Sequence, residues 1–96
     1  MDKKIIWSPR AADDLEDIYT FIANQSEFYA SLVVQRIMQI IESIPQFPYS
    51  GRMVPEYDME SLREKFYKHY RIVYRIKNDI IEIVAISHGA RLLRDI

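Results

Sequence analysis

The chain contains no cysteine among its 96 residues. This excludes disulfide bonds and thiolate metal sites, and it is typical of proteins that work in a reducing compartment. Long apolar runs are also missing, so the sequence predicts no helix that crosses a bilayer. The first residues, Met1 to Lys4, are followed by only three apolar residues, too few for the apolar core of a secretory signal. We therefore expect a cytoplasmic protein that has no membrane partner.

Glycine and net charge are scarce as well. Two glycines and four prolines leave no flexible linker, and the length suits one domain with a modest core, residues 1–96. The net charge of −1 argues against a dedicated nucleic-acid-binding protein, which is usually basic throughout. Residues 63–96 nevertheless carry eight Lys or Arg and four Asp or Glu, whereas residues 1–62 carry five and ten. This separation predicts a basic sheet, suited to a polyanion or an acidic peptide, and an acidic helical half.

Two amphipathic helices are predicted in the acidic half. Ser8 and Pro9 form a strong helix start, and apolar residues then recur at helical spacing up to about Asn24. Ser26 is suited to cap a second helix over residues 27–44, which ends at a proline. Two helices joined by so few residues should form an antiparallel hairpin. Residues 45–60 are rich in turn formers and predict a loop.

Four strands are predicted around the helices, at residues 3–7, 63–67, 70–77 and 80–87. The strand at 63–67 is charged and should lie at an edge, whereas the last strand is nearly all apolar and should be central. Asn78 and Asp79 fit a two-residue type I′ turn between the last two strands. The pattern does not place the first strand. The order β-α-α-β-β-β predicts an α+β fold, with the helical hairpin on one face of a small, twisted, largely antiparallel sheet.

Several segments, in this order and spacing, resemble the toxins of the RelE/ParE superfamily, which belong to type II toxin–antitoxin systems. The resemblance covers nearly the whole chain. Its segments are Trp7-Ser8-Pro9 with residues 14–19, the loop 47–56, Leu62-Arg63-Glu64, and residues 70–75 and 86–91. The resemblance implies a growth inhibitor that a small antitoxin neutralises.

The resemblance leaves three functions open, because members of this superfamily share one fold. ParE-like members, known from plasmid stabilisation, poison DNA gyrase, and the modest net charge favours this function. RelE-like members are mRNA interferases, endoribonucleases that cut mRNA on the ribosome, and the charged sheet favours that alternative. A second alternative is an inactive relic that only binds its antitoxin. Whether the chain is an enzyme stays open at this point.

Cleavage of RNA by its 2′-OH needs a proton acceptor, cations for the phosphate and an acid for the leaving oxygen. By position, the resemblance implies that Arg63, Lys65, Arg71 and Arg91 are the cations and that His88 is the acid or base. RelE itself has a functional tyrosine past the last arginine, and this chain has no aromatic residue there. The nuclease site that the sequence predicts is therefore incomplete.

Two of these residues, and two tyrosines near them in the sequence, also have a structural interpretation. Arg71 suits an exposed strand position or a salt bridge with Glu82 on the next strand. Tyr70 and Tyr74 suit the core better than a base-stacking surface. His88 stands at a strand end, where histidine is commonly a hydrogen-bonded structural residue.

The expected partner is a cognate antitoxin with a DNA-binding half and a tail that folds on binding. We expect this tail to dock in a groove between the helical hairpin and the sheet, with acidic side chains against two arginines. The predicted docking residues are Ile18, Phe21, Ile22, Phe47, Arg52, Val54, Arg71 and Arg91. The apolar helical hairpin would also support a homodimer. No metal-ligand spacing or glycine-rich phosphate loop is present, so we expect no metal and no cofactor.

Overall fold

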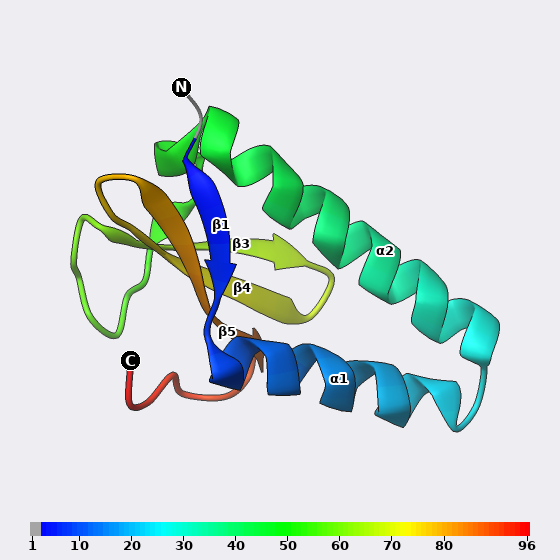
Figure 1. The fold of residues 1–96 in the computed structure, drawn as a ribbon. Helices are drawn as coiled ribbons and strands as arrows, with labels where there is room; N and C mark the ends of the chain where they lie inside the picture. The colour runs from blue at the N-terminus through cyan, green and yellow to red at the C-terminus, as the bar shows by residue number, and fades with distance from the viewer. Residues whose placement is uncertain (1–2) are drawn as a thin grey trace.

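The computed structural model describes residues 3–96; Met1 and Asp2, the beginning of the predicted domain, lie outside it. Two helices and a sheet form an α+β architecture, with both helices on one face of the sheet (Figure 1). This confirms the predicted fold class. The elements in chain order are β1 (Lys4–Trp7), α1 (Pro9–Ala23), α2 (Glu27–Ser43), β2 (Arg52–Met53), β3 (Leu62–Tyr67), β4 (Tyr70–Ile76) and β5 (Ile80–His88).

The two helices begin where their serine caps predict. The side-chain oxygen of Ser8 accepts a hydrogen bond from the N–H of Ala11 at 3.0 Å, and that of Ser26 accepts one from Tyr29 at 3.0 Å. Each cap satisfies one of the free N–H groups of the first helical turn. Pro45 then turns the chain into two short 3-10 helices, Ile44–Gln46 and Pro48–Ser50. No helix within residues 3–96 is both long and apolar enough to span a bilayer.

The five strands are arranged in the order β1-β5-β4-β3-β2. β5 lies between β1 and β4, so the prediction of a central, buried last strand is confirmed. β1 is parallel to β5, and the other pairs are antiparallel. The prediction that residues 63–67 form the edge is wrong along the start of β3, because β2 pairs with it there. Two residues are too short a strand to be visible as a pattern in the sequence.

The turn between β4 and β5 differs from the prediction. A type I′ turn requires positive φ at both central residues. The described residues other than glycine that have positive φ are Asp58, Lys68 and Asp95, so neither Asn78 nor Asp79 is among them. Without a glycine, the turn avoids the left-handed region, which disfavours residues that carry a Cβ.

Apolar side chains are buried on both faces of the sheet. The larger core lies between the sheet and the helices and includes Ile37, Ile41, Ile72 and Ile83. A second core lies on the other face, where strand residues pack against Leu93 and against residues of the segment that follows β2. We call residues 89–96 the C-terminal tail. The second face is therefore covered by irregular chain instead of a helix. Its buried apolar residues are Val54, Leu62, Val73, Val84, Ala85 and Leu93.

Candidate functional site

The predicted cations of the sheet lie on two different faces. Residues that are opposite each other on paired strands share a face of the sheet. Arg63 is opposite Tyr74 and Lys65 is opposite Ile72, so both cations are on the helical face. Arg71 alternates with these core positions of β4 and is therefore on the other face. The structure does not bring these three cations together.

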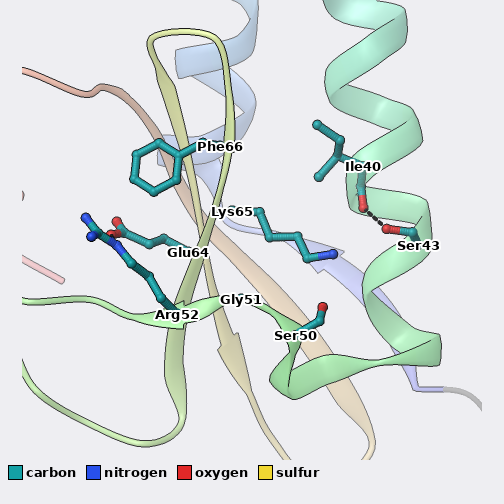
Figure 2. A pocket seen from close by; sticks show the side chains of 8 residues that line it. All are labelled: Ile40, Ser43, Ser50, Gly51, Arg52, Glu64, Lys65 and Phe66. Carbon is teal, nitrogen blue, oxygen red and sulfur yellow. Dashed lines mark hydrogen bonds and ion pairs between the residues drawn. The ribbon is translucent and has the colours of Figure 1, made fainter.

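Lys65 points into a shallow hollow between β3 and the end of α2. Figure 2 shows its ammonium group directed toward α2, whereas Arg52 and Glu64 extend to the opposite side of β3. The hollow measures about 430 Å³, and Ser43 and Ser50 contribute hydroxyl groups to its lining. It is an open surface of mixed polar and apolar lining, into which Lys65 brings a positive charge.

Arg63 is held by its own neighbourhood. Its Nε donates to the carbonyl oxygen of Glu60 at 2.8 Å, and its Nη1 donates to that of Gly51 at 3.1 Å. Its guanidinium carbon lies 5.1 Å from the ring centre of Tyr49, a distance at which cation and ring attract each other. These contacts fix the segments before and after β2 against β3.

Arg71 is buried in an ion-pair cluster. It is 4% exposed; its Nε donates to Glu64 Oε1 at 2.7 Å, and its Nη1 and Nη2 donate to the two oxygens of Glu56 at 2.8 Å each. The hydrogen bonds that Arg71 donates to Glu56 lower the pKa of Glu56 to about 2. The same bonds are the main cause that raises the pKa of Arg71. Arg52 donates to the second oxygen of Glu64 at 2.6 Å. Each hydrogen bond between these four side chains joins a cation to an anion, the strongest kind in proteins.

The cluster corrects both structural interpretations of Arg71. The side chain is not exposed, and its carboxylate partners are Glu56 and Glu64. Glu82 instead lies 3.8 Å from Arg75 and 3.3 Å from Lys77. Glu64 is buried as well, because it is 1% exposed.

The C-terminal tail is tied to the rest of the molecule by hydrogen bonds. The N–H of Leu93 donates to Glu56 Oε2 at 3.0 Å, and Arg71 Nη1 lies 3.4 Å from the carbonyl oxygen of Arg91. At the start of α1, Arg10 Nη1 donates to the carbonyl oxygen of Arg94 at 2.6 Å. Figure 1 shows the tail running from the end of β5 back past the start of α1. Glu56, Arg10 and Leu93 were not predicted, because nothing in the sequence indicates that the loop and the tail meet.

A wide opening lies between α1, the end of β5 and the tail, and we call it the α1–tail cleft. Its volume is about 720 Å³, within the range of ligand-binding pockets. Ile18 and Phe21 line it from α1, His88 from β5, and Arg91 and Leu92 from the tail. The cleft thus brings together three predicted docking residues and two predicted catalytic residues.

The other predicted docking residues lie elsewhere. Ile22 packs against the larger core and Val54 is fully buried in the second core. Phe47 is 66% exposed, and Arg52 has an exposed side chain that pairs with Glu64. These four residues therefore do not line the α1–tail cleft.

Tyr74 agrees with its structural interpretation as a core residue, whereas Tyr70 and His88 line the α1–tail cleft. Tyr74 is fully buried; its hydroxyl donates to the carbonyl oxygen of Pro48 at 2.6 Å and accepts from the N–H of Gly51 at 3.1 Å. Burial raises the pKa of Tyr74. The ring of His88 is stacked on that of His69, with centroids 5.9 Å apart. No group of three or more His, Asp or Glu side chains within residues 3–96 is placed to hold a metal ion.

Comparison with known proteins decides the family. The family described as the ParE toxin of the type II toxin–antitoxin system, parDE, matches residues 5–93. The chain belongs to this family. Toxin RelE2 of Caulobacter vibrioides is 30% identical over 90 residues, which cover 93% of this chain and 98% of that protein. Putative toxin Y4kP of Sinorhizobium fredii is 33% identical over 89 residues, 91% of this chain and 88% of that one.

Solved structures share the fold at lower identity. A chain of the chromosomal ParDE system of P. aeruginosa superposes with a TM-score of 0.74 at 22% identity, covering 90% of this chain and 95% of that one. A YoeB/ParE toxin from Agrobacterium tumefaciens gives 0.64 at 20% identity, over 88% and 96% of the two chains. The family match and the two toxin relatives identify the chain as a toxin of the ParE/RelE superfamily, and a type II toxin has a cognate antitoxin as its partner.

Proposed function

We propose that this toxin is a ParE-like growth inhibitor that acts by binding DNA gyrase. The dispersal of the predicted catalytic residues carries the proposal. Arg63 and Lys65 are on the helical face of the sheet, and Arg71 is buried on the other face. His88 and Arg91 line the α1–tail cleft. A toxin that acts by binding needs a surface that fits its target. It does not need cations that converge on one reacting group.

Electrostatic catalysis depends on cations that point at the position where charge develops. The guanidinium of Arg71 already faces the carboxylates of Glu56 and Glu64. A phosphate at this place would have to displace both carboxylates and would leave Glu64 buried without its main partner. The cost of such an uncompensated buried charge is several kcal/mol.

Ribosome-dependent cleavage of mRNA is the second candidate. It is favoured by the α1–tail cleft, where the imidazole of His88 and the guanidinium of Arg91 line one opening. An imidazole and a cation are two of the groups that such a cleavage needs. One relative, from Caulobacter vibrioides, is named Toxin RelE2.

The test is induction of the toxin without antitoxin, followed by two separate readouts. We expect growth arrest, loss of negative supercoiling in a reporter plasmid, and intact mRNA by primer extension. Codon-linked mRNA cuts with normal supercoiling would replace the proposal by the ribonuclease. Unaffected growth with well-folded toxin would leave only the antitoxin-binding relic.

We also propose that the antitoxin tail docks in the α1–tail cleft, with Ile18, Phe21 and Arg91 as its contacts. Phe21 is 76% exposed and Leu92 is 69% exposed, which suits apolar anchors on a partner. Acidic antitoxin side chains would meet Arg91, because Arg71 is buried with partners of its own. Phe47 remains available as an outlying contact.

A further inference from the structure

β5 is longer than its neighbour β1. The parallel pairing of β1 runs from Lys4 opposite Ile80 to Trp7 opposite Ile83, and α1 then leads the chain away. β5 continues to His88, so its last residues have a strand neighbour on one side only. The open side faces the α1–tail cleft, which Ile86, Ser87 and His88 line.

The register identifies the main-chain groups on this side. Gly89 donates its N–H to the carbonyl oxygen of His69, so the groups of Ser87 also face β4 and those of Ile86 and His88 face the open side. Asp14 confirms the direction, because its Oδ2 accepts from the N–H of Ile86 at 2.9 Å. The carbonyl oxygen of Ile86 and the N–H of His88 have no hydrogen-bond partner within residues 3–96. These two groups flank Ser87. In a parallel ladder, one residue of an added strand would donate its N–H to the first group and accept from the second.

We propose that an extended, acidic partner segment adds to the sheet here as a short strand beside Ile86–His88. The inference deepens the proposed function, since the antitoxin tail is the segment that would fill this position. It would continue the line of β1 where β1 ends. Main-chain hydrogen bonds then supply affinity, and alternate side chains supply specificity.

The two walls of the cleft differ in charge, and this predicts how the side chains of the added strand alternate. Asp14 and Asp17 lie on the α1 wall beside Ile18 and Phe21. Arg91 and Arg94 lie on the tail wall, and Arg10 adds a third guanidinium group near it. Acidic side chains of the partner would be repelled by Asp14 and Asp17 on the α1 wall. Apolar side chains should therefore face α1, and acidic ones should face the arginines of the tail wall.

A synthetic peptide tests the proposal without the antitoxin. The probe is a blocked peptide of about eight residues, a common strand length, with glutamate and leucine in alternation. It is titrated at neutral pH into the isotope-labelled full chain. We expect NMR shifts at His88 and slower hydrogen exchange of the His88 amide. Absence of binding overturns the proposal, as does a concentration-dependent dimer of the toxin that already protects this amide.

Matched peptides separate strand addition from binding by side chains alone. N-methyl groups are placed on all leucines in one peptide and on all glutamates in the other, because alternate N–H groups of a strand point to opposite edges. We expect one pattern to weaken binding roughly tenfold and the other to leave it nearly unchanged. Equal affinity of both methylated peptides overturns the proposal.

Charge reversal of the tail wall completes the test. Arg91→Glu should weaken peptide binding roughly tenfold, and Arg36→Glu, at an exposed position on α2, should not. Equal effects of the two reversals would mean nonspecific attraction and overturn the proposal. Growth arrest is measured separately. A toxin that inhibits gyrase but binds no peptide refutes strand addition alone, and a chain that binds the peptide but leaves growth unaffected refutes the proposed function alone.

Discussion

Glu64 and Arg71 lie on neighbouring antiparallel strands and share the face of the sheet that is remote from the helices. Arg71 Nη2 is 2.6 Å from Glu64 Oε1, and both side chains are almost completely buried. The pair is flanked by Arg52 on one side and Glu56 on the other. Through Glu56 the cluster reaches the N–H of Leu93, so it joins β2, β3, β4 and the C-terminal tail. Its contacts make it a structural centre of this face.

Loss of Arg71 should therefore destabilise the fold. We expect Arg71→Ala to lower the free energy of unfolding by about 3 kcal/mol, because it leaves the buried Glu64 carboxylate with Arg52 alone. Urea denaturation followed by circular dichroism measures the change. The double variant Glu64→Leu with Arg71→Met is the control; it should cost less, because it removes both charges together. A fully stable Arg71→Ala variant that no longer arrests growth would instead make Arg71 a functional cation.

The acidic limb of the stability profile should depend on Glu56. Its pKa is lowered from 4.5 to about 2 by the hydrogen bonds from Arg71. A group with a depressed pKa stabilises the fold fully above its unfolded pKa, and this contribution is lost as the pH falls from 4.5 toward 2. Because Glu56 is partly exposed, we expect a loss of only about 1 kcal/mol.

Glu56→Gln is the test of this contribution. The variant should be less stable than the parent at neutral pH, and the two chains should converge near pH 2. Thermal melts across the acidic range measure the difference. A constant gap at all pH values would show that the carboxylate charge of Glu56 contributes nothing to stability.

Substitution of Gly51 should destabilise the fold, because the structure leaves no room for a side chain at this position. A Cβ at Gly51 would lie 2.6 Å from the hydroxyl of Tyr74 and 2.7 Å from the carbonyl oxygen of Glu64. The φ of Gly51 is −76°, so the backbone itself permits other residues. We expect Gly51→Ala to cost about 1–3 kcal/mol in the free energy of unfolding, as overpacking typically does. Gly89→Ala is the matched control, because its nearest contact is 3.1 Å, and an equal cost for both would contradict this explanation.

Local signals in the sequence predicted the elements well. Ser8 and Ser26 cap the helices as expected, because a cap depends only on the next few residues. The central position of β5 followed from its apolar composition. The position of β1 did not follow, because a strand that pairs with a segment more than seventy residues away leaves no local pattern.

The candidate site was harder to predict, because side-chain faces alternate at every residue of a strand. A shift of one residue exchanges the two faces. Arg63 and Lys65 were grouped with Arg71 by position, whereas it is Glu64 that shares the face of Arg71. The contacts of Glu56 with Arg71 and with Leu93 join segments that only the folded chain brings together. Partners of this kind decide whether an arginine is available to a ligand.

Arg91 is the residue that should separate function from stability. Its side chain is exposed in the α1–tail cleft, and the contact with Arg71 uses only its carbonyl oxygen, which any residue retains. We expect Arg91→Ala to abolish growth arrest and to weaken antitoxin binding roughly tenfold, as the loss of a charge-assisted hydrogen bond does. The free energy of unfolding should change by less than about 0.5 kcal/mol, as is usual at the surface. Arg36→Ala, on the exposed side of α2, is the control and should keep both activities. If Arg91→Ala arrests growth and binds antitoxin as the parent does, the α1–tail cleft faces neither the target nor the antitoxin.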